Sequence, residues 1–331
     1  MADSPPREPL LEISGLNVSF HTRRSVVRAV RDLDLSLYRG ETLALVGESG
    51  CGKSVTAHSI TQLIPVPGKI ESGRIVFEGR DLVGLTEKEI RAYRGERISM
   101  IFQEPMTSLN PVFKVGHQIA DILVTHHRIP RKAAFEKAIE LLDLVKIPAP
   151  KRRAHAYPHQ LSGGMRQRVM IAMALASPSP GLLIADEPTT ALDVTIQAQI
   201  LELLNDLQRK IHVSILLITH DMGVVAENAE RVIVMYAGRK VEEGDLEEVI
   251  GRAAHPYTRG LLNSLPSNPK YENARRLEAI RGTVPDMITV GDGCPFANRC
   301  AWAAEVCGWE FPAAREMAPG HRAWCHFAGT I

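Results

Sequence analysis

Apolar residues along the first 46 positions follow the pattern of extended strands. In the run DLDLSL, Leu33, Leu35 and Leu37 alternate with polar residues, as they do in a strand with one buried face. The next apolar run, ETLALV, leads directly into Gly47. Residues 10–46 are therefore predicted to form β-structure.

Further short apolar runs follow this β-region. After the turn at Gly47, SVTAHSITQLI predicts a helix that is stopped by Pro65 and Pro67. The runs GRIVFEGRDL and RISMIFQ predict two strands, the second buried and ending at Gln103. From residue 181, the runs LLIAD, SILLIT and RVIVMY alternate with helical stretches such as 195–210, which is typical of a mainly parallel sheet with crossover helices.

The middle and the end of the chain differ from this α/β alternation. Between about 105 and 177 the pattern is helical, and RKAAFEKAIELLDLV places apolar side chains on one helix face: Phe135, Ala138, Ile139, Leu142 and Val145. Residues 251–331 lack any such rhythm. We therefore expect one α/β domain over 10–250 with a helical subdomain at about 105–177, a separate C-terminal region at 251–331, and a polar, disordered N-terminus at 1–9.

Composition narrows the class of protein. The 331 residues are 45% hydrophobic and 23% charged, as in an ordinary soluble protein, and the formal charge of +1 gives no general attraction to nucleic acid. No apolar run approaches the length of about 18 residues that a membrane helix needs. The N-terminal MADSPPREPL is unlike a signal peptide. We expect a cytoplasmic chain that reaches a membrane only through partner proteins.

The sequence GESGCGKS fits the phosphate-loop pattern G-x-x-x-x-G-K-[ST]. Glycines allow backbone N–H groups to surround phosphate oxygens, while Lys53 would reach the β- and γ-phosphates of ATP and Ser54 would bind Mg²⁺. A strand before the loop and a helix after it favour this interpretation over a glycine-rich turn without a ligand. The candidate ATP-binding residues are Gly47, Glu48, Ser49, Gly50, Cys51, Gly52, Lys53 and Ser54.

Two acids follow the buried run LLIAD. Asp186 is placed to hold Mg²⁺, and Glu187 is a candidate to polarise the attacking water. Taken alone, an Asp-Glu pair after a strand also fits a capped turn. Together with the phosphate loop, the pair predicts ATP hydrolysis.

A second glycine turn, LSGGM, lies in the helical part of the chain. Ser162 suits a helix N-cap, and Gly163 and Gly164 would expose N–H groups at the start of that helix. We interpret this turn as a surface that contacts the γ-phosphate of an ATP held by another subunit. Two chains, arranged head to tail, would then enclose two nucleotides.

These residues resemble the ATP-binding subunits of ABC transporters. GESGCGKS, LSGGM, LLIADE, ALD (191–193) and ITH (218–220) stand in that family's order. The resemblance implies an α/β fold with a P-loop NTPase core of the ABC type: a mixed sheet with an N-terminal antiparallel β subdomain, a helical subdomain and a small cysteine-rich C-terminal module.

The resemblance also implies roles for individual residues. Gln103 would be the Q-loop residue that senses Mg²⁺ and the attacking water, and His220 would contact the γ-phosphate. Asp193 would couple the two sites of the dimer, and Phe20 would stack on adenine. No catalytic position departs from the family pattern, so we expect a working ATPase.

Two segments, MIFQEPMTSLNP (100–111) and HPYTRGLLNSLP (255–266), resemble the oligopeptide/dipeptide/nickel importer branch. In that branch the first segment lies against the permease, and Pro105 and Pro111 would stiffen it. The implied partners are two permease subunits, a paralogous ATPase or a second copy, and indirectly an extracytoplasmic binding protein. The implied location is the cytoplasmic face of a bacterial inner membrane.

The cargo stays open between di- or oligopeptides and nickel or another small solute. A free-standing ABC ATPase that acts on nucleic acid is the alternative from another class. About 110 residues separate the phosphate loop from LSGGM without a heptad run, and the chain has one ATPase core. Both observations disfavour that alternative, and we expect no nucleic-acid partner.

Four of the five cysteines lie near the C-terminus with the spacing C-x5-C-x6-C-x17-C: Cys294, Cys300, Cys307 and Cys325. Four thiolates can hold a [4Fe–4S] cluster or zinc, with His321 and His326 as possible zinc ligands, and buried free thiols are the third possibility. The region resembles the C-terminus of dipeptide and oligopeptide importer ATPases, which implies a [4Fe–4S] cluster of structural role. All three tryptophans of the chain fall in the same stretch and would pack around it.

Overall fold

The structure is a computed structural model that describes residues 8–103, 108–176, 180–190, 192–265 and 280–330. It divides into two compact units. The first unit combines Met1–Tyr38, Thr42–Gly84 and Ile218–Ile331, and the second combines Arg39–Glu41 with Leu85–Leu217. The first unit is therefore built from both ends of the sequence.

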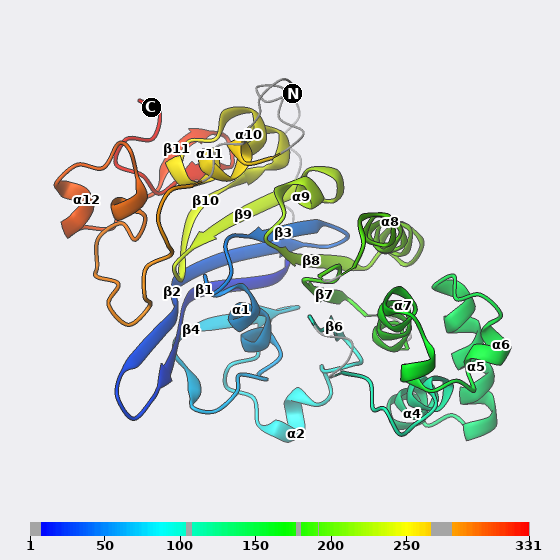
Figure 1. Cartoon of the computed structure of the whole chain (residues 1–331). Coiled ribbons are helices and arrows are strands. Elements are labelled where there is room, and N and C mark those ends of the chain that lie inside the picture. The colour runs from blue at the N-terminus through cyan, green and yellow to red at the C-terminus, as the bar shows by residue number, and fades with distance from the viewer. Residues whose placement is uncertain (1–7, 104–107, 177–179, 191, 266–279, 331) are drawn as a thin grey trace. The chain divides into compact units, whose positions relative to one another are not determined.

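An antiparallel sheet forms one layer of the first unit (Figure 1). Its strand order is β2-β1-β4-β5, with bounds β1 Pro9–His21, β2 Val26–Tyr38, β4 Gly68–Phe77 and β5 Arg80–Asp81. Leu33, Leu35 and Leu37 of β2 are all buried, which confirms the predicted alternation. The sequence predicts a disordered segment over residues 1–9. Residues 1–7 of that segment lie outside the described residues, and Pro9 is already the first residue of β1.

A second group of strands in the first unit has the order β11-β12-β10-β9-β3. Their bounds are β3 Thr42–Val46, β9 Arg231–Tyr236, β10 Arg239–Asp245, β11 Arg315–Ala318 and β12 His321–Ala323. Strand β3 runs parallel to β9, with Leu43 opposite Arg231, whereas β9, β10, β12 and β11 pair antiparallel. The five residues of β3 are all buried, and the strand ends where Gly47 begins the glycine turn.

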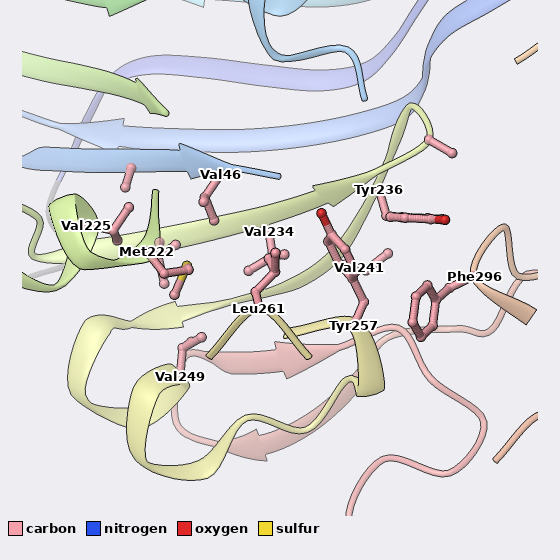
Figure 2. Close-up of a cluster of buried hydrophobic side chains, with 13 residues drawn as sticks. Val46, Met222, Val225, Val234, Tyr236, Val241, Val249, Tyr257, Leu261 and Phe296 are labelled. Carbon is pink, nitrogen blue, oxygen red and sulfur yellow. The ribbon is translucent and has the colours of Figure 1, made fainter. Parts of the chain in front are cut away.

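Short helices complete the first unit: α1 Lys53–Ile60, α9 Met222–Asn228, α10 Leu246–Arg252, α11 Pro256–Asn263, the 3-10 turn Ala297–Arg299 and α12 Val306–Trp309. Figure 2 shows the apolar core between β9, α9 and α11, which includes Val46, Val234, Tyr236, Tyr257 and Phe296. The three aromatic rings pack together, with centroid separations of 4.6 to 5.4 Å. This core connects the strand before the glycine turn to the C-terminal region.

In the second unit the strands follow the order β8-β7-β6. Their bounds are β6 Ile98–Ile101, β7 Leu182–Asp186 and β8 Ser214–Thr219, and β6 and β7 run parallel. The predicted strands LLIAD, SILLIT and RVIVMY are thus confirmed as β7, β8 and β9. Strand β8 passes into the first unit at Ile218.

In the described residues of the second unit, the helices are α2 Glu87–Ile90, α4 Val115–His127, α5 Arg131–Leu144, α6 Pro150–Arg153, the 3-10 turn Pro158–Gln160, α7 Gly163–Ala174 and α8 Val194–Ile211. Helices α4, α5 and α7 pack against one another (Figure 1). Helix α5 confirms the predicted period, although Phe135 and Ile139 are only partly buried and Ala134 and Leu141 share its buried face. None of the helices in the described residues is long and apolar enough to cross a membrane.

Candidate functional site

The glycine turn GESGCGKS is a loop that leaves β3 and enters α1, as predicted. A Cβ atom on Gly47 would lie 2.2 Å from the carbonyl oxygen of Met235, and one on Gly52 would lie 2.4 Å from that of Ala29. Gly50 and Gly52 also adopt left-handed backbone, with φ of 81° and 104°. The backbone therefore approaches its surroundings too closely for any side chain at two of these positions.

Lys53 lies inside this loop and is only 4% exposed. Its Nζ donates hydrogen bonds to the carbonyl oxygens of Gly47 at 2.6 Å and Glu48 at 3.1 Å. Burial raises the pKa of the adjacent Cys51 thiol, although the lysine charge acts in the opposite direction. Ser54 stands in the first turn of α1, while Ser49 and Gly50 are exposed. The loop thus presents exposed backbone around a buried ammonium group, which suits polyphosphate.

Asp186 is the last residue of β7 in the second unit, and Glu187 directly follows it. Asp186 is 2% exposed, and Glu187 is 8% exposed with a left-handed φ of 45°. The Oε2 atom of Glu187 accepts hydrogen bonds from Gln103 Nε2 at 3.1 Å and from Thr190 Oγ1 at 2.8 Å. The structure therefore brings Gln103 and Glu187 together across 84 residues of sequence. Thr190 is a further member of this site that the motifs alone did not single out.

The LSGGM turn begins α7, and Ser162 is its N-cap, as predicted. The Ser162 side chain accepts the N–H of Met165 at 3.3 Å. Gly163 is partly buried, whereas Gly164 is buried against α8: a Cβ there would lie 2.6 Å from Cγ2 of Ile196. The second glycine is thus required for helix packing within the unit.

Asp193 is the N-cap of α8. Its side chain accepts the N–H of Ile196 at 3.0 Å. This capping bond is a structural role beside the predicted coupling role of Asp193, which stays a prediction. Ala191 of the ALD motif lies outside the described residues.

His220 and Phe20 belong to the first unit, as does the phosphate loop. His220 is exposed and directly follows β8; Asp221 then caps α9. Phe20 is partly buried in β1, and a Cβ on Gly68 would lie 2.6 Å from its ring. The ring therefore packs on backbone of the neighbouring strand β4, and its stacking on adenine stays a prediction.

The four C-terminal cysteines line one cavity in the first unit, together with His255, Phe296 and His326. All four are free thiols. Burial raises the pKa of Cys294 to about 12, and the Cys307, Cys325 and Cys300 thiols act in the same direction. Within the described residues, no group of three or more His, Cys, Asp or Glu side chains is arranged to hold a metal ion.

Two expectations about this region are wrong. His321 does not line the cavity; it is buried and pairs with Glu242 at 2.8 Å, so it is no zinc ligand in this arrangement. The tryptophans do not line the cavity either, because Trp302 and Trp309 are 47% and 75% exposed and Trp324 packs against the ammonium group of Lys240. The aromatic lining comes from Phe296 and Phe327 instead.

Two family models match the chain. The model described as ABC transporter matches residues 30–190, which include the phosphate loop, LSGGM and both acids. The model described as the C-terminal region of oligopeptide/dipeptide transporters matches residues 241–307, which include three of the four C-terminal cysteines.

Similar proteins cover almost the whole length. The chain is 55% identical over 298 residues to the oligopeptide transport ATP-binding protein OppD of Bacillus subtilis, covering 90% of this chain and 83% of the relative. It is 51% identical over 326 residues to a probable peptide ABC transporter ATP-binding protein of Sinorhizobium fredii, covering 98% and 97%. Among solved structures, a dimeric ATP-binding cassette bound to ADP and phosphate aligns with a TM-score of 0.65 at 27% identity, over 71% of this chain and 98% of that one.

Proposed function

The chain belongs to the ABC transporter ATP-binding proteins, and from this premise we propose that it is the ATP-hydrolysing subunit of an importer of di- or oligopeptides. Two observations support the proposal. Lys53 is buried inside the glycine loop, and the Glu187 carboxylate accepts hydrogen bonds from Gln103 and Thr190. The peptide cargo is supported by relatives named for peptide transport and by the match of residues 241–307.

Each of these groups would have its own role in ATP hydrolysis. Lys53 and the loop N–H groups would neutralise the phosphates, and Glu187 would accept the proton of the attacking water while Gln103 keeps that carboxylate oriented. The Ser54 hydroxyl and the Asp186 carboxylate are oxygen donors of the kind that Mg²⁺ takes, and the ion would supply charge neutralisation. His220 would contact the γ-phosphate. These roles agree with ATP and Mg²⁺ as the nucleotide and metal of the family.

A dimer would complete each site. The N-terminus of α7, with Ser162 as its cap, would present N–H groups to the γ-phosphate held by a second ATPase subunit. One of the solved structures that the chain resembles is a dimer with ADP and phosphate, which supports this arrangement. The second subunit would be a paralogue or another copy of this chain.

A permease would dock close to the start of α4. Val112 and Phe113 are 70% and 54% exposed there, directly after Pro111, and an exposed apolar pair favours a protein contact. Pro105, the other proline of this predicted docking segment, lies outside the described residues. Through this contact the chain would work at the cytoplasmic face of the membrane, beneath two permease subunits supplied by an external binding protein.

The first test uses Glu187→Gln, which should bind ATP, lose turnover and stay in a closed dimer. After gentle solubilisation with ATP, mass spectrometry should identify two permease subunits and an ATPase partner. Soluble chain alone, or chain with nucleic acid, would contradict the importer proposal. The docking surface is tested by the double change Val112→Ser and Phe113→Ser. In the Glu187→Gln background this double change should abolish co-purification of the permease. In the otherwise wild-type chain it should leave the ATPase rate of the purified protein unchanged. The cargo then follows from screening the associated binding protein with peptides and nickel.

We further propose that the four C-terminal cysteines hold a [4Fe–4S] cluster. The support is the shared cavity alone: all four thiols line it although they span more than thirty residues of sequence, and in the described structure they are not arranged as a metal site, so binding would require them to move together. Four thiolates form the usual ligand set of such a cluster, and zinc is the alternative. When bound, the cluster would cross-link the C-terminal module.

Iron, acid-labile sulfide and zinc should be measured after anaerobic purification. Iron and sulfide in the wild type and their loss in Cys300→Ser are the expected results, with Cys51→Ser, outside the cavity, as the control that keeps its iron. Zinc without iron would assign zinc, and metal-free protein would mean buried free thiols.

A further inference from the structure

The phosphate loop is tied to the C-terminal region through Glu48. The Glu48 N–H donates to the hydroxyl oxygen of Tyr257 at 2.8 Å. The Arg299 guanidinium donates to both carboxylate oxygens of Glu48, from Nη1 at 2.6 Å and from Nη2 at 3.1 Å. Both partners stand more than 200 residues away in the sequence, and neither belongs to a motif of the ATP site.

Arg299 is itself fixed on several sides. Its side chain is 5% exposed, against 28% for Glu48. Nη1 also donates to the Tyr236 hydroxyl at 3.0 Å, and Nε donates to the Arg281 carbonyl oxygen at 2.9 Å. A planar guanidinium with its other donors engaged has one orientation, so it can set the position of the carboxylate that it binds.

Tyr257, the other partner of Glu48, is held in place by the buried aromatic core. Figure 2 shows Tyr257 reaching from α11 toward β9 within the aromatic core. Burial raises the pKa of its phenol, so the hydroxyl stays protonated and neutral. A neutral oxygen can accept the Glu48 N–H without introducing charge next to the loop.

Glu48 also bonds to later residues of the phosphate loop. Its carbonyl oxygen accepts hydrogen bonds from Lys53 Nζ at 3.1 Å and from the Cys51 N–H at 3.3 Å. The N–H, the side chain and the carbonyl of one residue are therefore all engaged. Movement of Glu48 would shift the lysine ammonium and the N–H groups that follow it.

We propose that Arg299 is a positioning residue for ATP: through Glu48 it holds the phosphate loop in the shape that receives the nucleotide. It would act without touching the nucleotide itself. This inference rests on the proposed ATPase function. A loop that is already ordered binds more tightly, because ordering it on binding costs free energy.

The test is equilibrium binding of a fluorescent ATP analogue to the purified chain, together with steady-state ATPase kinetics. Arg299→Met should weaken ATP binding and raise KM for ATP roughly tenfold, within the usual range of coupling between sites. The kcat at saturating ATP should change less than about twofold, because the groups around Glu187 are unaltered. Arg299→Lys should recover part of the affinity, since an ammonium group restores the charge but not the paired contact.

Arg31→Met is the matched control. Arg31 is also 5% exposed and also bonds to the C-terminal region, at Gly291 and Asp292, but within the described residues its side chain does not bond to the phosphate loop. Both variants should melt at lower temperature than the wild type, and only Arg299→Met should lose ATP affinity. Equal affinity losses in the two variants would reduce Arg299 to a structural cross-link.

A double-mutant cycle tests the route through Glu48. Glu48→Ala combined with Arg299→Met should bind ATP no more weakly than Glu48→Ala alone, because the alanine already removes both oxygens that accept from Arg299. Additive losses would overturn the proposal, as would unchanged affinity in Arg299→Met. A wild-type chain that binds no ATP would instead contradict the proposed function.

Discussion

Glu187 stands in a left-handed backbone conformation that is uncommon for a residue with a side chain. Its left-handed φ of 45° is unfavourable for a residue with a side chain, and two donors converge on one of its carboxylate oxygens. The two hydrogen bonds restrict the orientation of the carboxylate. Such a restricted acid is suited to act as a base on a bound water.

Thr190 should therefore matter for the chemical step. Thr190→Val removes the hydroxyl that donates to Glu187 Oε2 at 2.8 Å and keeps the side-chain shape. Because a hydrogen bond to a charged group contributes about 1.5–3 kcal/mol, kcat should fall by about tenfold or more, with KM for ATP nearly unchanged. Steady-state ATPase assays would check this, and Thr190→Ser should recover the rate. A Val variant at wild-type kcat would show that Gln103 suffices.

The two glycines of LSGGM should respond differently to alanine. Gly164→Ala would place a Cβ 2.6 Å from Ile196, so we expect a loss of about 1–3 kcal/mol in the free energy of unfolding. Gly163→Ala would meet only Leu192, at 3.6 Å, and should be neutral or stabilising because alanine favours helix. Urea unfolding measures both. Equal effects of the two changes would contradict the packing argument for Gly164.

Short-range motifs predicted the groups that we propose to contact ATP, and they missed the residues that hold these groups in place. Lys53, Glu187 and Ser162 stand at fixed offsets from glycines or strands, because phosphate binding and helix capping are local. Thr190 has no such signal, and Arg299 reaches Glu48 across 251 residues. Tryptophans near cysteines suggested an aromatic shell, but sequence proximity does not determine which side chains point inward.

At the scale of elements, helix α8 begins at a residue with one observed role, capping, and one proposed role, coupling of the two ATP sites. Asp193 caps the helix, and removal of a capping side chain costs about 1 kcal/mol. Asp193→Ala should lose about that much stability in urea unfolding, whereas Asp193→Asn should keep it. If the asparagine variant is stable but hydrolyses ATP more slowly, the proposed coupling role is distinct from capping. Equal destabilisation by both changes would mean that the charge, not the cap, stabilises the helix.

Apolar periodicity predicted the long elements and failed for the shortest. Strands β7, β8 and β9 are buried runs bounded by turns, so their positions follow from the sequence. Strands β11 and β12 span only Arg315–Ala318 and His321–Ala323. They form because β12 pairs with β10, from a segment some eighty residues earlier. A pairing partner at that separation leaves no periodic signal.

For the whole molecule, the proposed cluster at the four cysteines should be coupled to the ATP site. Cys300 directly follows Arg299, so ligation of its thiol would restrain the guanidinium that binds Glu48. Cys300→Ser should weaken binding of the fluorescent ATP analogue several-fold, within the usual range of coupling between sites. The same change should add little in an Arg299→Met background. Loss of iron without a change in ATP affinity would contradict the coupling.

The first unit is assembled from segments at both ends of the sequence, and this affects how it folds during synthesis. Strand β3 pairs with β9, which leaves the ribosome nearly 190 residues later, so at ordinary translation speed the apolar β3 waits roughly 10–40 s for its partner. Meanwhile β1, β2 and β4 can already pair with one another. A nascent chain halted before residue 231 would hold an antiparallel sheet, a hydrophobic strand β3 without its partner β9, and a phosphate loop without the Arg299 contact. Such a chain is a substrate for chaperones and proteases before it can act as an ATPase.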